Sequence, residues 1–332
     1  MTDGGETGGP EGARRFLVPA LRAAASVLML GLLVRRVHLS SLLPEWRPHG
    51  AVFLGGALAA TLCGVVLSAL RWQRVLVALE LPARLRVLVA NYLASLFVGN
   101  FLPSTIGGDV LRVGRLSGRN GDAPGTFASV VLERLSGWVV LPVISLIGLF
   151  GNPTLLRLGN ASRLALAIAL GTLALLLALM IATASPRLGG RLAHNEGWLR
   201  FMGAVHLGLD RFRRHPGAAV EVLVAGFAYQ LVVMLAAFLG AQAIGLDVGW
   251  TAILAFMPAV AIAQLIPVTI GGLGVRAGAV LLFLGPLGVG AAQAITFDVL
   301  LYGMNLVVSL LGAPAFAVGD RGRGRPTASA TA

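Results

Sequence analysis

One short pattern occurs twice in this chain, and both copies lie in strongly apolar surroundings. The first copy, at 103–114, reads Pro-Ser-Thr-Ile-Gly-Gly-Asp-Val-Leu-Arg-Val-Gly, and the second lies at 267–278. A constant offset of 164 residues gives seven identities in these twelve positions. Irregular backbone at membrane depth is tolerated only where protein or a wet cavity satisfies its polar groups. Two matched interruptions in two halves of a chain therefore point to a binding site of the transporter kind.

The composition supports a membrane location for this pattern. The 332 residues are 57% apolar and only 12% charged, whereas a soluble domain carries about twice that charge. Several uncharged stretches of about 20 residues predict spanning helices. The apolar runs are continuous, unlike the alternating strands of a small β-barrel. We predict an all-α polytopic membrane protein with a single membrane domain over 14–318 and disordered tails at 1–13 and 319–332.

Six spans follow from the apolar runs, at about 16–34, 50–70, 126–150, 161–184, 217–244 and 291–318. The arginine-rich stretch 71–86 is expected to lie on the membrane surface, and 185–216 is the largest polar loop. Around each copy of the pattern, two short apolar arms are expected to form a re-entrant hairpin, over about 87–118 and 251–285.

The distribution of arginine favours these hairpins over full crossings. With the N-terminus inside, the scheme puts 19 arginines in cytoplasmic segments and five in outside loops, as the positive-inside rule requires. The halves, roughly 14–150 and 155–318, then each hold three spanning helices plus one re-entrant hairpin. Because each half crosses an odd number of times, the second half is inserted upside down, which makes the two halves inverted repeats.

The chemistry of the pattern suits an anion. The second arm of each hairpin begins at the glycine pair, so the N–H groups and positive dipole end of a helix point into the membrane. Arg112 and Arg276 add a fork suited to phosphate. Alternatively, proline and glycine only shape the hairpin tips while both arginines bond carbonyls of neighbouring helices. The candidate headgroup-binding residues are Thr105, Gly107, Gly108, Asp109, Arg112, Glu133, Arg134, Thr269, Gly271, Gly272 and Arg276.

The acidic residues near this site each allow two interpretations. Asp109 begins an arm, where it either caps the helix or serves in proton coupling or as a partner of arginine. Glu133 and Arg134 are neighbours on one helix and do not face each other. We expect Glu133 to pair with Arg112 and Arg134 to line a cavity, with a purely structural ion pair as the alternative. Asp298 occupies the corresponding region of the last span and is a weaker candidate.

Signatures of enzymes are missing from the sequence. It has no Walker loop, no nucleophile elbow and no His/Cys cluster, so we expect no catalytic residue, no metal and no cofactor. An intramembrane transferase with Glu133 or Asp109 as its base remains an alternative. The basic stretches lack interleaved aromatic residues, so no nucleic-acid partner is expected.

Three segments, 100–112, 130–137 and 266–276, resemble the lysylphosphatidylglycerol synthase transmembrane region family. The resemblance covers about 16–318 and implies a plasma-membrane, flippase-like protein with cytoplasmic termini, which moves an anionic phospholipid or a polyprenyl-linked sugar between leaflets. The alternative is a non-transporting subunit that presents lipid to a partner glycosyltransferase or other lipid-modifying synthase. The synthase domain is expected to be absent. The family often has Arg-Glu where this chain has Arg276-Ala277, so Arg276 is expected to lack that acidic partner.

Overall fold

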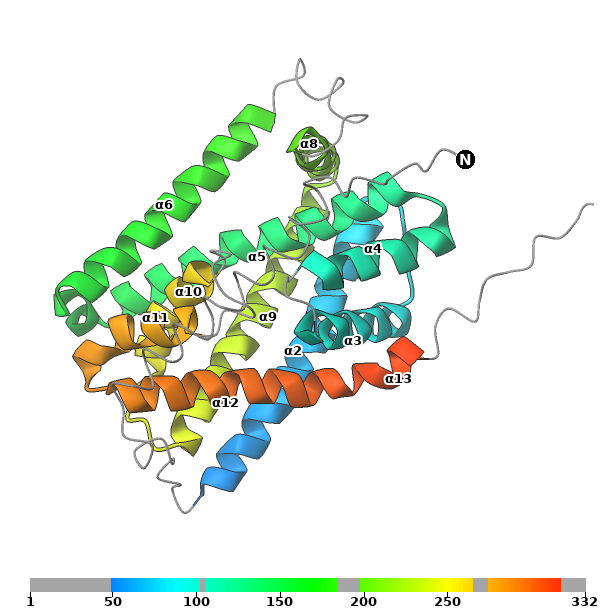
Figure 1. Cartoon of the computed structure of the whole chain (residues 1–332). Coiled ribbons are helices and arrows are strands. Elements are labelled where there is room, and N and C mark those ends of the chain that lie inside the picture. The colour runs from blue at the N-terminus through cyan, green and yellow to red at the C-terminus, as the bar shows by residue number, and fades with distance from the viewer. Residues whose placement is uncertain (1–48, 102–105, 184–197, 265–273, 318–332) are drawn as a thin grey trace, which may run out of the picture.

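The fold is built from helices joined by short connections (Figure 1). The computed structural model describes residues 49–101, 106–183, 198–264 and 274–317, and these ranges contain no strand. Their elements are α2 (Gly50–Ala78), α3 (Leu85–Phe101), α4 (Ile106–Asn120), α5 (Ala123–Gly151), η2 (Pro153–Arg157), α6 (Asn160–Thr183), α8 (Trp198–Arg214), α9 (Pro216–Ala243), α10 (Trp250–Ala263), α11 (Val275–Leu284), η4 (Gly285–Leu287), α12 (Ala291–Leu310) and α13 (Gly312–Ala317).

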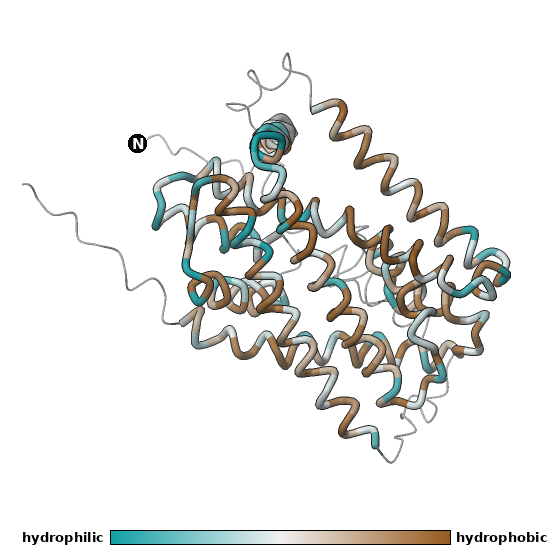
Figure 2. Tube along the Cα trace, turned by 180° about the vertical axis from the view of Figure 1, so that it is seen from behind, coloured by the Kyte–Doolittle hydropathy of each residue, from teal (hydrophilic) through white to brown (hydrophobic). Residues whose placement is uncertain are grey.

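Five helices in the described ranges are long and apolar enough to cross a membrane, namely α2, α5, α6, α9 and α12. The shorter apolar helices are α3, α10 and α11. Hydrophobic residues run along most of α6, whereas hydrophilic residues gather at α8 (Figure 2). The chain is therefore an all-α, multi-pass membrane protein, as predicted. The first predicted span, 16–34, lies outside the described residues.

Helix starts follow from local sequence. The Asp122 side chain caps α5 by accepting a hydrogen bond from the Gly125 N–H at 2.8 Å, with proline in the first turn. Proline also stands in the first turn of η2 and of α9. A proline costs little in the first turn, because the N–H that it lacks has no partner within the helix there.

The prediction that 71–86 lies on the membrane surface is wrong for its first half. Helix α2 does not end near residue 70 but continues to Ala78. Trp72, Val75 and Leu76 fall at helical spacing, and all three are fully buried. Packing of this apolar face outweighs the two arginines of the segment, which extends α2 into the protein interior.

Close helix contacts join the first part of the chain to the second. Helices α2 and α9 lie side by side (Figure 1), α10 packs along α5, and α3 packs against α12 and α13. Glycine makes two of these contacts possible, because a Cβ on Gly148 would overlap the backbone at Ala255 and a Cβ on Gly312 would overlap the carbonyl of Leu93. The Ser145 hydroxyl adds a 2.6 Å hydrogen bond to the carbonyl oxygen of Ala255.

Two further predictions need correction. The last span, predicted as continuous over 291–318, is divided into α12 and α13, and Pro314 stands in the first turn of α13. A proline there cannot continue the hydrogen bonds of the preceding helix. The predicted polar loop 185–216 contains α8, which packs against α5 where Gly208 meets the side chain of Leu132.

Candidate functional site

The two copies of the repeated pattern lie at helix ends. In the first, α3 ends at Phe101 and α4 begins at Ile106; in the second, α10 ends at Ala263 and α11 begins at Val275. Four candidate residues lie outside the described ranges: Thr105, Thr269, Gly271 and Gly272. Gly107 and Gly108 lie in the first turn of α4, and a Cβ on Gly108 would come 2.7 Å from the carbonyl oxygen of Ser95. Gly108 therefore permits the close approach of α4 to α3.

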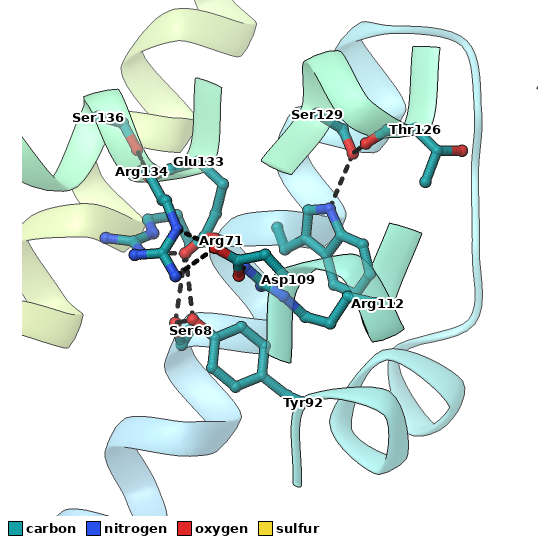
Figure 3. A network of polar contacts seen from close by, with 11 residues as sticks. Ser68, Arg71, Tyr92, Asp109, Arg112, Thr126, Ser129, Glu133, Arg134 and Ser136 are labelled. Carbon is teal, nitrogen blue, oxygen red and sulfur yellow. Dashed lines mark hydrogen bonds and ion pairs between the residues drawn. The ribbon is translucent and has the colours of Figure 1, made fainter. Parts of the chain in front are cut away.

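Five charged side chains form a chain of alternating sign, Arg71–Glu133–Arg112–Asp109–Arg134, which we call the ionic cluster (Figure 3). Arg112 donates to Glu133 Oε2 at 3.2 Å and to Asp109 Oδ1 at 2.6 Å. Arg71 donates to Glu133 Oε1, and Arg134 Nε donates to Asp109 Oδ2 at 2.6 Å. The cluster thereby joins α2, α4 and α5.

Exposure changes along the ionic cluster. The side chains of Arg71, Glu133 and Arg112 are 5%, 1% and 2% exposed, whereas those of Asp109 and Arg134 are 19% and 40% exposed. The cluster therefore has one buried end, at Arg71, and one accessible end, at Arg134. The spacing of α5 causes this change, because adjacent helix residues such as Glu133 and Arg134 point in different directions.

Aromatic rings and hydroxyl groups surround the buried end. The guanidinium of Arg112 lies over the rings of Trp72 and Tyr92, 5.0 and 4.5 Å from their centroids, and that of Arg71 lies 4.7 Å from the centroid of Tyr229. Such cation–π contacts stabilise a desolvated guanidinium.

The hydroxyl oxygens of Ser68 and Tyr92 lie 2.6 Å apart, and each is 3.4 Å from Glu133 Oε1. This carboxylate is therefore shared by two arginines and two hydroxyl groups. Charge-assisted hydrogen bonds of this kind are about twice as strong as neutral ones, which suits Glu133 to hold α2, α3, α4 and α5 together.

Even so, some donors remain unsatisfied. The buried atoms Nε and Nη1 of Arg71 and Nε of Arg112 have no hydrogen-bond partner in the described structure. Buried polar groups without partners are uncommon in folded proteins, and each calls for an explanation such as a bound group.

The second copy of the pattern has a smaller ionic pair. Arg276 binds the Asp298 carboxylate through Nε and the Asp298 carbonyl oxygen through Nη2 at 2.9 Å. The expectation that Arg276 lacks an acidic partner is therefore wrong, because α12 supplies the acid that the position of Ala277 does not. Gly274, directly before α11, has φ 86°, a left-handed conformation that favours glycine.

A cavity of about 270 Å³ lies among α2, α3, α9, α10, α11 and α12. Its walls are mainly apolar and include Val65, Leu96, Val233, Met234, Met257 and Met304. Polar groups interrupt these walls at Thr61, Ser68, Tyr92, Tyr229, Gln264, Arg276 and Asn305. Because Ser68, Tyr92 and Tyr229 also contact the ionic cluster, the cavity reaches it through these three side chains.

The structure separates the candidate residues that the sequence grouped together. The predicted pair of Glu133 with Arg112 is present, and Asp109 is a partner of arginine in the first turn of α4, not a cap before it. Arg276 lines the cavity, whereas neither Arg112 nor Arg134 is among its described lining residues. The prediction that Arg134 lines the cavity is therefore wrong for the part of the chain that the structure describes.

Three site residues escaped the sequence analysis: Ser68, Arg71 and Tyr229. Arg71 was assigned to a surface segment because two arginines seemed to end the span. The apolar positions 72, 75, 76 and 79 have the spacing of a helical stripe and would have predicted the longer helix. No group of three or more metal-ligating side chains occurs in the described residues.

Comparisons with known proteins agree with this architecture. Residues 20–312 match the family model described as the lysylphosphatidylglycerol synthase TM region. No curated protein and no solved structure matches the chain. The family match covers most of the chain, including both copies of the repeated pattern and the whole ionic cluster. The chain therefore belongs to the lysylphosphatidylglycerol synthase transmembrane region family.

Proposed function

We propose that this protein is a lipid flippase, which moves an anionic phospholipid or a lipid-linked sugar between the leaflets of the plasma membrane. One observation carries the proposal: an apolar cavity between the two parts of the chain has Arg276 in its wall and adjoins the ionic cluster. A cavity of this kind can take hydrocarbon along its walls and a charged group at its polar end. We propose no catalytic role for the chain.

We further propose that the two parts are inverted repeats, each with three spanning helices and one re-entrant hairpin. Their contacts support this arrangement, because α10 packs on α5 as α3 packs on α12 and α13. The residues at these contacts are Ser145 and Gly148 in one case and Ser309 and Gly312 in the other, and both pairs differ by the 164 residues that separate the two copies of the pattern.

The arginine-bearing sites follow the same offset. Arg112 pairs with an acid of α5 and Arg276 with an acid of α12, the helix that follows the pattern in each half. Rocking of one half against the other around the central cavity would open it to each leaflet in turn, as in other transporters with inverted repeats.

The proposed orientation puts both termini in the cytoplasm. Contacts gather one arginine-rich end of the bundle: Arg211 of α8 pairs with Glu80, and Arg74 of α2 pairs with Glu221 of α9. The opposite end, formed by η2, η4 and the residues between α9 and α10, holds only Arg157. Arginine accumulates in cytoplasmic segments of membrane proteins.

Cysteine labelling tests this topology. In a variant without the native Cys63, single cysteines at Glu80, Gly121, Asp247 and Gly288 are labelled with an impermeant reagent in sealed vesicles. We expect the first two to react from one side and the last two from the other. Labelling of Glu80→Cys and Gly121→Cys from opposite sides would contradict the first hairpin.

Leaflet exchange in vesicles tests the transport function. The purified chain is reconstituted with fluorescent phosphatidylglycerol or phosphatidylcholine, and the fraction accessible to an impermeant quencher is followed with time. We expect exchange above that of protein-free vesicles, and we expect Arg276→Gln to slow it, because the variant loses the only described cation in the cavity wall. Rates equal to those of empty vesicles for every lipid tested would reject transport.

The second candidate is a non-transporting subunit that presents lipid to a glycosyltransferase or synthase. Helix α8 favours it, because this helix ends in Arg211, Arg213 and Arg214 at the arginine-rich end, where a soluble partner could dock. This candidate predicts a stable complex with such an enzyme and no leaflet exchange by the chain alone. Replacement of Arg213 and Arg214 by Gln would then weaken the complex.

A further inference from the structure

The ionic cluster has one positive charge in excess. It contains three guanidinium groups and two carboxylates. The other described carboxylates that form ion pairs do so elsewhere, Glu80 with Arg211, Asp210 with Arg214, Glu221 with Arg74 and Asp298 with Arg276. Inside a protein, a charge without a counter-ion is strongly unfavourable, so the cluster is suited to receive one more negative charge.

The vacancy lies at the ends of the alternating chain. Arg112, inside the chain, has two carboxylate partners, whereas Arg71 and Arg134 at the ends have one each. Arg134 is 40% exposed, so its surroundings can screen it. Arg71 is 5% exposed, and its atoms Nε and Nη1 have no acceptor. The buried end therefore has the greater need of an anion.

Two glycines and one tyrosine define the surroundings of Arg71. A Cβ on Gly137 would come 2.8 Å from Arg71 Nη1, and a Cβ on Gly226 would come 3.7 Å from Arg71 Cδ. Tyr229 contacts the guanidinium of Arg71 with its ring and also lines the cavity. The charges of Arg71 and Arg134 both act on the Tyr229 hydroxyl. Tyr229 is thus the side chain where the cavity and both ends of the cluster approach one another.

We infer that the ionic cluster is a receptor for one singly charged phosphodiester group, which reaches it from the cavity past Tyr229 and is bound by the free N–H groups of Arg71. This inference rests on the proposed lipid-binding role of the cavity and names the charge class of its ligand. A phosphodiester brings one negative charge and two free oxygens, which match the surplus charge and the two unpartnered nitrogens.

Other headgroups match the cluster less well. A phosphomonoester carries about −1.5 to −2 charge at pH 7 and would over-compensate the cluster. A zwitterionic lipid brings its own cation next to three arginines. The apolar cavity wall at Val65, Val233 and Met234 accepts the hydrocarbon that accompanies a lipid phosphodiester, although a small soluble phosphodiester has the same charge.

The test is a binding titration of the full-length protein in detergent. The ligands are phosphatidylglycerol, phosphatidic acid, phosphatidylcholine and the soluble dimethyl phosphate, with bound lipid counted by native mass spectrometry and the unfolding midpoint measured in parallel. We expect phosphatidylglycerol to bind more tightly than phosphatidic acid and phosphatidylcholine. Loss of a charge-assisted hydrogen bond lowers affinity by about tenfold or more, and we expect that loss for phosphatidylglycerol in Arg71→Gln.

Arg74→Gln is the matched control. Arg74 lies on α2 one turn after Arg71, but its side chain is 45% exposed in an ion pair with Glu221. We expect this variant to keep the affinity for phosphatidylglycerol. Equal losses in Arg71→Gln and Arg74→Gln, or equal affinities for phosphatidylglycerol and phosphatidylcholine in the unmodified protein, would overturn the inference.

A second pair of variants changes no charge and keeps the test valid where Arg71→Gln does not fold. Gly137→Ala puts a methyl group against Arg71 Nη1, whereas the nearest side-chain atom to a methyl at position 226 is 3.4 Å away. We expect Gly137→Ala to weaken phosphatidylglycerol binding and Gly226→Ala to leave it nearly unchanged. Unaltered binding in Gly137→Ala, with the protein folded, would overturn the assignment to Arg71.

The ligand arms also separate sources and functions. Binding of phosphatidylglycerol without dimethyl phosphate supports a lipid ligand, and equal binding of both supports a site for free phosphodiesters; either outcome upholds the charge class. Leaflet exchange without preference for monoanionic lipid would overturn this inference and leave the flippase proposal intact. Selective binding without leaflet exchange would uphold the inference and reject transport.

Discussion

The two copies of the repeated pattern place an arginine at the same point of each half, but the two arginines have different surroundings. Arg112 is enclosed by two acids and two aromatic rings and is 2% exposed. Arg276 has one acid, is 14% exposed and lines the cavity. The first copy therefore anchors the bundle, and the second faces the space that a ligand can enter. The repeat preserves the scaffold, while the acids contributed by neighbouring helices decide how each arginine is used.

The largest expected effect comes from Glu133, which the second copy does not match. Glu133→Gln removes the carboxylate shared by Arg71 and Arg112 and leaves two buried guanidinium groups poorly paired. Removing one partner of a buried ion pair costs about 3–5 kcal/mol, so we expect a loss of that size in the free energy of unfolding. Titration with a denaturing detergent, followed by circular dichroism, measures it. A loss below about 1 kcal/mol would show that the ionic cluster does not anchor the bundle.

The glycine contacts should be alike in both halves. Gly148→Val and Gly312→Val each force a branched side chain against helix backbone, and overpacking of this kind costs about 1–3 kcal/mol. We expect similar losses in the free energy of unfolding for the two variants. Gly171→Val is the control, because a Cβ at that position has no neighbour within 4 Å. A large loss at only one of the two contacts would contradict their equivalence.

Asp298→Asn should have a smaller effect than Glu133→Gln. Arg276 keeps its 2.9 Å hydrogen bond to the Asp298 carbonyl oxygen and is partly accessible from the cavity. A hydrogen bond to a charged group contributes about 1.5–3 kcal/mol, so we expect a loss near the lower end of this range. A loss equal to that of Glu133→Gln, measured under the same conditions, would remove the distinction between an anchored and an accessible arginine.

Arg74→Ala should have the smallest effect on stability. It breaks the exposed pair with Glu221, and pairs of this kind contribute about 0.2–1 kcal/mol. Its unfolding curve should therefore nearly coincide with that of the unmodified protein. A loss above about 2 kcal/mol would mean that this end of α2 depends on surface ion pairs and not on its buried apolar face.

Much of the helix plan could be predicted from composition. Spans predicted at 126–150, 161–184 and 217–244 correspond to α5, α6 and α9 within a few residues, because about 20 apolar residues in helical form match the thickness of a membrane. The boundary at residue 70 was wrong because charge was taken to end a span. Arg71 stays inside because Glu133, 62 residues away in the sequence, receives it.

The sequence by itself determined the class of protein, the positions of most helices and the repeat that places an arginine in each half. These features depend on local composition and spacing, which a single chain displays directly. Only the tertiary structure decided which acid meets which arginine, that Arg71 and Tyr229 adjoin the cavity, and that Arg276 finds its partner in α12. Ion pairs between helices depend on how the helices rotate and pack, and that information is spread over the whole apolar surface of the chain.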